Sequence, residues 1–143
     1  MGLLDRFTRG VSAPKVRAVE AVWVESHGDS VEVVGESFYR DALLAATGRR
    51  GNEYVRHPVV AALIREPDNA YDPNAVGVWV EGRKVGHLSV ADAIEYQGAL
   101  LRLGANGKVL ACDALICARD GTPNLGVWLE LPCADDVLQQ ISE

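Results

Sequence analysis

The sequence predicts a mainly β domain with two to three helices, an α+β chain whose strands form a small antiparallel β-barrel. Six or seven short segments are rich in β-branched and apolar residues and end at turn residues, which is typical of strands. Two segments between them carry apolar residues at helical spacing. With 143 residues, 48% of them hydrophobic, the chain can build one core and is too short for two. This pattern indicates an antiparallel barrel.

The first third of the chain contains two predicted strands and a helix. Residues 16–24 alternate in polarity, and residues 31–34 form a second apolar run. Residues 37–47 follow a helical pattern, with Ser37 in the N-cap position and Gly48 directly after the last turn. We therefore expect a helix to follow the second strand.

The central third predicts three strands around polar connections. Residues 49–56 are polar and basic, which indicates a mobile loop. Strands are expected at residues 59–65, 75–81 and 84–88. The second of these ends at a turn, so the last two form a tight antiparallel pair.

A second helix is expected after Ser89. This serine is followed three residues later by Asp92, which occupies the capping-box position. The apolar side of this helix is predicted to consist of Ile94, Leu100, Leu101 and Leu103. Gly104 then ends the helix. Strands at residues 108–118 and 126–131 and a short helix at 134–141 complete the predicted elements.

The connection at residues 65–75 is the most informative segment. It is about ten residues long, whereas a two-residue turn would be enough to connect the two strands. Its two prolines fix φ, and its asparagine and aspartate side chains can bond back to the backbone. We therefore expect a rigid loop that presents Asn69, Tyr71 and Asp72 together, as a binding site would require.

Three blocks of sequence resemble the HIRAN domain family. The loop at residues 65–75 reads Arg-Glu-Pro-Asp-Asn-x-Tyr-Asp-Pro-Asn-Ala and precedes Val-x-Val. Residues 84–89 read Lys-Val-Gly-His-Leu-Ser, and residues 33–39 match the Val-x-Gly-x-x-aromatic-Tyr segment of the family. The blocks occur in family order and cover residues 31–103, with weaker similarity to residue 131. The chain looks like one of the short stand-alone bacterial members.

The resemblance implies a fold and a function. HIRAN domains occur in helicase-like DNA repair remodellers, are similar to an OB-type barrel, and bind single-stranded DNA at a free 3′ end. This implies a HIRAN-like domain at residues 15–133, between a flexible tail at 1–14 and a short helix or tail at 134–143. It also implies a non-catalytic module for DNA repair, with a single-stranded DNA end as ligand and a helicase or nuclease acting in trans as a possible partner.

The site residues implied by the resemblance come from two of these blocks. In nucleic-acid-binding members, the matching positions form the pocket for the terminal nucleotides, and an acidic residue meets the end hydroxyl. Carried over, the pocket residues are Val34, Phe38, Tyr39, Asn69, Tyr71 and Asp72. The basic residues considered for phosphate contact are Arg40, Arg65 and Lys84.

The chemistry of Asp72 fits the recognition of a strand end. A carboxylate repels the phosphates of a continuing strand, but it accepts a charge-assisted hydrogen bond from a terminal sugar hydroxyl. Selectivity for an end then arises because the wrong ligand is repelled.

Simpler roles stay open for several of these residues. Phe38 is either a core residue of the helix or a platform for a base, and Asn69 and Asp72 can serve only to organise the loop. The sequence departs from the family at two positions: Ser37 and Val90 stand where DNA-binding members carry basic residues. The loss of these two charges weakens the electrostatic attraction to phosphates. The alternative function is therefore a protein-interaction or scaffold domain that keeps the fold without DNA binding.

Charge alone decides little about nucleic acid. The net charge is −6, whereas phosphate-binding proteins usually show a basic footprint. Residues 37–108, however, hold nine basic and eight acidic side chains, so the excess negative charge lies in the two ends of the chain.

Enzymatic and metal chemistry find no support in the motifs. The sequence holds no Walker loop, zinc motif or catalytic triad order, so no cofactor or metal is expected. Cys112 and Cys117 are five residues apart in one predicted strand and would face opposite sides of the sheet, which opposes joint ligation of a metal.

The sequence also bears on the location of the protein. An odd cysteine count without a secretory signal favours the cytoplasm. The sequence contains no run of 18 apolar residues, so no membrane span is predicted. The N-terminus, with Leu3, Leu4 and Phe7, is either a frayed tail or a contact for a membrane surface or a partner.

Overall fold

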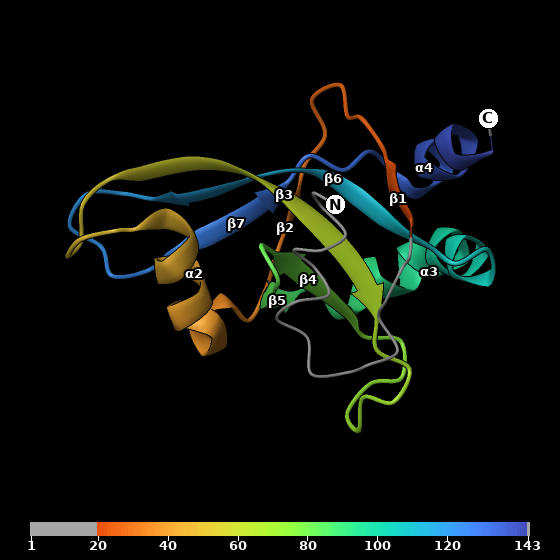
Figure 1. The fold of residues 1–143 in the computed structure, drawn as a ribbon, viewed down its shortest axis with the longest axis horizontal. Coiled ribbons are helices and arrows are strands. Elements are labelled where there is room, and N and C mark those ends of the chain that lie inside the picture. The colour runs from red at the N-terminus through yellow and green to blue at the C-terminus, as the bar shows by residue number, and fades with distance from the viewer. Residues whose placement is uncertain (1–19, 143) are drawn as a thin grey trace.

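Seven strands form one curled sheet within residues 20–142, the part of the chain that this computed structural model describes (Figure 1). The strands are β1 (Glu20–Trp23), β2 (Val31–Glu32), β3 (Val55–Arg65), β4 (Val76–Val80), β5 (Arg83–His87), β6 (Lys108–Ala118) and β7 (Gly126–Leu129). The order along the sheet is β2-β7-β6-β3-β4-β5, with β1 paired parallel to β6 and the other pairs antiparallel. The predicted fold class is confirmed.

The two ends of the sheet meet at a single bridge. Val34, just beyond β2, exchanges backbone hydrogen bonds of 2.8 and 2.9 Å with His87 of β5. Gly86 permits this approach, because a Cβ there would lie 2.4 Å from Cγ1 of Val33 and 2.7 Å from the carbonyl oxygen of Val34. The chain segment 33–39 is thereby fixed against β5.

The long pair β3 and β6 forms the centre of the sheet. The pairing runs from Val55 opposite Ala118 to Leu63 opposite Leu110. β3 starts at Val55 rather than at residue 59, because its first residues find their partners on β6, far away in the sequence. Cys112, near the middle of β6, is fully buried, and burial raises the pKa of its thiol to about 12.

The loop predicted at residues 49–56 is present at 49–54, but Val55 and Arg56 belong to β3 and the loop is anchored at its first residue. Arg49 is buried and donates hydrogen bonds to the carbonyl oxygens of Glu53, Arg119 and Thr122. The segment is anchored by acceptors from the β6–β7 connection, a contact that no local pattern could predict.

The first helical segment differs from the predicted helix at its start. A 3-10 turn, η1 (Glu36–Tyr39), follows Gly35, whose φ of 77° is left-handed. The α-helix α2 (Arg40–Thr47) begins only after it, so Ser37 is not an N-cap. The end of α2 agrees with the prediction, since Gly48 adopts a φ of 67° there.

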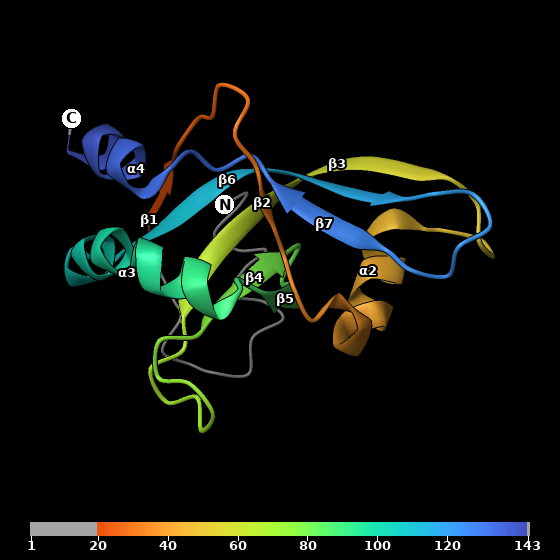
Figure 2. The same cartoon turned by 180° about the vertical axis from the view of Figure 1, so that it is seen from behind.

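Two further helices lie side by side at one end of the sheet (Figure 2). They are α3 (Val90–Ala105) and α4 (Ala134–Ile141). Ser89 accepts a 3.1 Å hydrogen bond from the backbone N–H of Asp92, which confirms the predicted cap. Tyr96 of α3 is buried and donates a 2.7 Å hydrogen bond to the carbonyl oxygen of Pro132, just before α4. Val137 of α4 is buried in the same core.

The proposed division of the chain remains a prediction. The predicted tail at residues 1–14 and the first part of the strand predicted at 16–24 lie outside the described residues. Of that strand, β1 is the described portion.

Candidate nucleic-acid interface

The β3–β4 loop is organised by the side chains of Asn69 and Asp72. Asn69 Oδ1 accepts hydrogen bonds from the backbone N–H groups of Tyr71, at 2.8 Å, and of Asp72, at 3.0 Å. Asp72 Oδ1 in turn accepts a 2.9 Å bond from the N–H of Asn74. These are two successive Asx turns, the local geometry that the sequence favours. Both side chains therefore organise the loop.

The loop displays one aromatic ring in open solvent. Tyr71 is 99% exposed. Asp72, directly after it, is half-buried, and within residues 20–142 its side chain makes its hydrogen bond through Oδ1. Oδ2 is then the oxygen that can meet a ligand.

Glu66 links this loop to β5. Its Oε1 lies 3.0 Å from Asn69 Nδ2 and 3.0 Å from His87 Nε2, and its Oε2 forms an ion pair with the ammonium of Lys84. Burial raises the pKa of Glu66, but the hydrogen bonds from Lys84, Asn69 and His87 outweigh it and hold the pKa below its usual value. Because an ionised carboxylate can only accept, His87 carries a proton on Nε2.

Gly77 of β4 makes room for this carboxylate. A Cβ at that position would lie 2.6 Å from Glu66 Oε2. Any other residue would push the carboxylate out of its place, so Gly77 is part of the site although it carries no side chain.

Three rings and one ammonium group lie next to the carboxylate. The ring of Tyr39 is 5.9 Å from that of His87, measured between centroids. Lys84 Nζ lies 6.0 Å from the centroid of Tyr39 and 5.8 Å from that of Trp79. The lysine is therefore held between two aromatic faces and an acidic partner.

Phe38 lies in solvent and not in the core. Its side chain is 86% exposed, because η1 replaces the first helical turn and turns the ring outward. Val34, on the bridge to β5, is also exposed. Of the two roles open for Phe38, the core role is wrong.

The structure joins part of the predicted site directly. Tyr39 and Lys84 contact each other, and Glu66 joins Lys84 to Asn69, whose side chain orders the backbone of Tyr71 and Asp72. Val34 belongs to the same region through its bridge to His87, whose ring is bonded to Glu66.

Two of the three basic residues considered for phosphate contact have other partners. Arg65 Nε donates a 3.1 Å hydrogen bond to Oε1 of Gln97 on α3, on the opposite side of β3 from Glu66. Arg40 donates to the carbonyl oxygen of Pro123. Lys84 is the basic residue that lies within the cluster.

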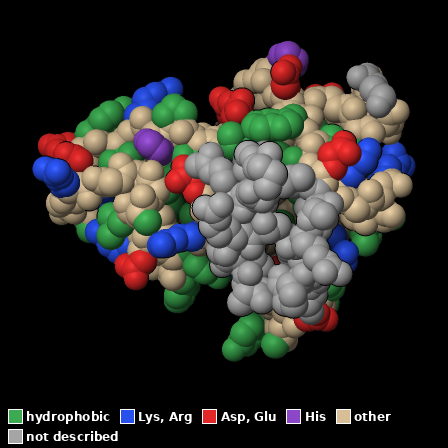
Figure 3. Space-filling view, viewed as in Figure 1, with side chains coloured by type: hydrophobic (Ala, Val, Ile, Leu, Met, Phe, Trp, Pro, Cys, Tyr) green, Lys and Arg blue, Asp and Glu red, His purple; other side chains and the backbone are tan. Residues whose placement is uncertain are grey.

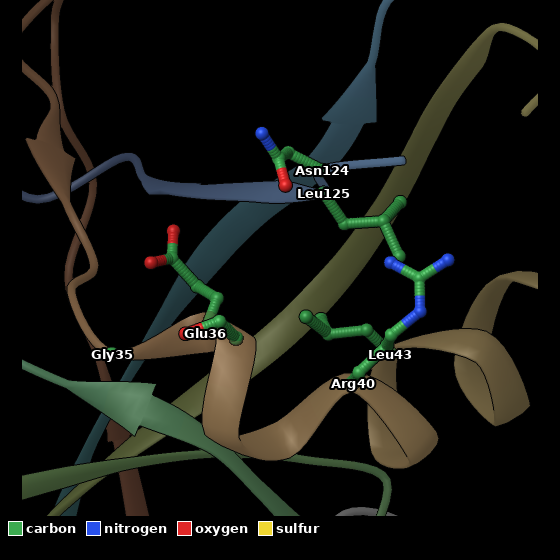
Figure 4. Close-up of a pocket in the computed structure, with 7 residues that line it drawn as sticks. Gly35, Glu36, Arg40, Leu43, Asn124 and Leu125 are labelled. Atoms are coloured by element: carbon green, nitrogen blue, oxygen red, sulfur yellow. The ribbon is translucent and has the colours of Figure 1, made fainter. Parts of the chain in front are cut away.

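Arg40 instead lines a separate groove of about 340 Å³ between η1, α2 and the β6–β7 connection (Figure 4). Its walls are Gly35, Glu36, Ser37, Arg40, Leu43, Asn124 and Leu125. The carboxylate of Glu36 and the guanidinium of Arg40 lie on opposite sides of this groove. Glu36 Oε2 accepts a 3.3 Å hydrogen bond from the N–H of Val127, so the carboxylate also has a structural role.

Sequence reasoning missed Glu66 and Trp79. Glu66 is the first residue after β3, and its partners come from β5, 18 and 21 residues later. The one local signal was Gly77, a glycine within an apolar strand, which often marks a close approach.

The fold is that of a small OB-like antiparallel β-barrel. The chain belongs to the HIRAN domain family, whose sequence profile matches residues 29–140, and the resemblance inferred from the three blocks is confirmed. HIRAN domains are binding domains, known in general to bind nucleic acids.

Comparison with solved structures gives a match to the crystal structure of the HIRAN domain of human HLTF. The two chains are 25% identical, the match covers 80% of this chain and 85% of the other, and the TM-score is 0.31. No curated protein sequence shows significant similarity to the chain.

No helix within residues 20–142 is long and apolar enough to cross a membrane. The same residues contain no group of three or more His, Cys, Asp or Glu side chains placed to hold a metal ion.

Proposed function

We propose that this domain binds single-stranded DNA and recognises its 3′ end without catalysing a reaction. The observation that carries the proposal is the ring of Tyr71, wholly exposed on a loop that two Asx turns hold rigid, with the carboxylate of Asp72 next to it.

Stacking supplies most of the affinity. Tyr71 and Phe38 are large exposed rings, and Val34 adds an exposed apolar contact. A base stacked on such a ring gains about 1–3 kcal/mol. Because the loop is already ordered, little conformational entropy is lost when the strand binds.

Asp72 supplies the preference for an end. The terminal 3′-hydroxyl donates to its carboxylate, whereas a 3′-phosphate or a continuing strand places negative charge against it. Asn69 supports this role, because its amide fixes the backbone at Asp72.

Phosphate contacts are weak in this member of the family. Lys84 is neutralised by Glu66, and Ser37 and Val90 carry no charge. On the face shown in Figure 3, Lys and Arg side chains are interspersed with Asp and Glu. Arg40 and Arg65 would have to give up their present hydrogen bonds to reach a phosphate. We therefore expect a shallow dependence of affinity on salt.

Fluorescence anisotropy with 5′-labelled oligonucleotides tests the proposal. At low salt, a 3′-hydroxyl oligonucleotide should bind more tightly than the same sequence with a 3′-phosphate. Asp72→Asn keeps an oxygen for the N–H of Asn74 and should remove the difference. Tyr71→Ala should lower the affinity for both ligands at least tenfold. The control is Tyr54→Ala, which removes an exposed ring just before the start of β3, at the end far from Tyr71, and should change neither affinity. Equal affinity for both ends, or no binding, would refute the proposal.

A protein-interaction domain without DNA binding is the second candidate. The ion pair between Lys84 and Glu66 favours it, because it removes the one basic group of the cluster from phosphate binding. The test uses a protein partner, such as a helicase or nuclease acting in trans. Support for this function would be a partner that binds Tyr71→Ala as well as the wild type but does not bind a chain truncated before Pro14.

A further inference from the structure

Helix α3 is apolar on two opposite faces. One face is buried in the core by Ala93, Tyr96, Ala99, Leu100 and Leu103. The other points to solvent and carries Val90, Ile94 and Leu101, which are 66%, 57% and 50% exposed. The predicted placement of Ile94 and Leu101 on the core side of this helix is therefore wrong.

The exposed residues form one continuous stripe. Together with Gly98 and Ala105, which are also exposed, they recur at intervals of three and four residues. At about 100° per residue these five positions fall within an arc of about 80°, almost opposite the buried face. A surface helix normally carries polar residues there, and an apolar stripe is typical of a contact surface.

The stripe is complementary to itself. In an antiparallel pair of α3 helices that cross between residues 97 and 98, Val90 of one copy lies opposite Ala105 of the other. Ile94 then lies opposite Leu101, and the two Gly98 residues lie next to each other at the crossing. A large side chain meets a smaller or equal one at each step. The two-fold symmetry of such a pair is the commonest arrangement of homodimers.

The charges beside the stripe fit the same arrangement. Glu95 and Arg102 lie on one flank of it, seven residues or about 10 Å apart along the helix, too far to pair with each other. The antiparallel pair brings each Glu95 next to Arg102 of the second copy. Arg102 otherwise donates a 3.0 Å hydrogen bond to Ser142.

Gly98 lets the two backbones approach. A Cβ built on it meets no atom of residues 20–142 within 4 Å, so packing among these residues does not require the glycine. In a helix interior glycine is unfavourable compared with alanine. A close crossing with a second helix gives it a reason.

We propose that the outward face of α3 is a self-association surface, on which a second copy of this chain packs antiparallel through Val90, Ile94, Gly98, Leu101 and Ala105. One helix face buries less than the roughly 800 Å² per partner of a standard interface. The dimer is therefore weak, with a dissociation constant between roughly 1 µM and 1 mM.

Sedimentation velocity of the full chain over this concentration range tests the proposal. The wild type should convert from monomer to dimer. Leu101→Glu should weaken the dimer at least tenfold, while Tyr54→Glu, an equally drastic change at an exposed residue outside α3, should leave it unchanged. Gly98→Leu should raise the thermal midpoint of the monomer and still weaken the dimer, so its effect cannot come from misfolding.

A charge exchange identifies the partner as a second copy in antiparallel orientation. Glu95→Arg and Arg102→Glu should each weaken the dimer, and the double variant should restore it. Ser142→Ala controls for the bond that Arg102→Glu also breaks and should leave the dimer intact. A wild type that stays monomeric at 1 mM overturns the proposal, as does a dimer that survives both Leu101→Glu and Gly98→Leu. A double variant no better than the single ones also overturns it. A third outcome would also overturn the proposal. If the wild type is a monomer in which residues 1–14 resist proteolysis, and Leu101→Glu abolishes this resistance, the N-terminal segment covers the stripe instead of a second copy.

Discussion

Charged side chains organise the chain near both ends of β3, and they do so in different ways. Beside the start of the strand, the guanidinium of Arg49 is buried and bonded to backbone carbonyl oxygens. At the other end, the carboxylate of Glu66 is bonded to side chains, those of Lys84, His87 and Asn69. Backbone acceptors cannot titrate or move to a ligand, whereas side chains can do both. The Arg49 end is therefore structural, and the Glu66 end can respond to a bound strand.

The largest effect should come from the structural end. Arg49→Met keeps the aliphatic stem but loses the bonds to three carbonyl groups, each worth about 1.5–3 kcal/mol for a charged donor. Met also removes the desolvation cost of a buried guanidinium whose Nη1 has no partner among the described residues, so we expect the free energy of unfolding in urea to fall by less than the sum of these bonds, by about 3 kcal/mol. The folded variant should still bind DNA through the Tyr71 loop, because that loop lies beyond the other end of β3, roughly 33 Å along the strand. A loss of binding in folded protein would remove the distinction between the two ends.

The next effect compares two glycines. Gly77→Ala places a Cβ 2.6 Å from Glu66 Oε2, whereas a Cβ at Gly98 meets no atom of the described part of the chain within 4 Å. Thermal unfolding should show a loss of about 1–3 kcal/mol for Gly77→Ala and a gain of up to about 1 kcal/mol for Gly98→Ala. Gly77→Ala should also weaken DNA binding, because it displaces the carboxylate that supports the loop. Equal stabilities of the two variants would contradict this account of Gly77.

Glu66→Gln sharpens the contrast at the ligand end. The change removes the charge that neutralises Lys84, so the lysine becomes available to phosphate. The slope of log affinity against log salt should steepen by about 0.7 for one additional contact with single-stranded DNA. The same substitution at Glu53, whose carboxylate accepts from the backbone N–H of Arg50, should leave the slope unchanged. A slope unaffected by Glu66→Gln would mean that Lys84 lies outside the path of the strand.

The smallest effect is a pH dependence of stability. Because the pKa of Glu66 is lower in the folded protein than in the unfolded chain, its contribution is present above the unfolded pKa of about 4.3. The contribution is lost as the pH falls through the folded pKa. The difference in unfolding free energy between wild type and Glu66→Gln should therefore be constant near neutral pH and shrink below about pH 4. A difference that grows on acidification would reverse the assigned direction.

The comparison also explains what the sequence could predict. The Asx turns of Asn69 and Asp72 and the caps at Gly48 and Ser89 depend on neighbours within four residues, and they follow from local rules. The partners of Arg49 and Glu66 depend on the register of strands far apart in the sequence. Phe38 was undecided because its exposure depends on the left-handed backbone at Gly35, which fixes the start of a 3-10 turn.

The reactivity of the Cys112 thiol can report how often the central strands β3 and β6 separate. The thiol is buried near the middle of β6, where β3 covers one edge, and its high pKa leaves almost no thiolate at neutral pH. Cys133, by contrast, is exposed and Cys117 is partly exposed, so an alkylating reagent will modify both in the native state. The slow reaction of the remaining thiol, Cys112, then measures how often β3 and β6 separate, without any cysteine being introduced.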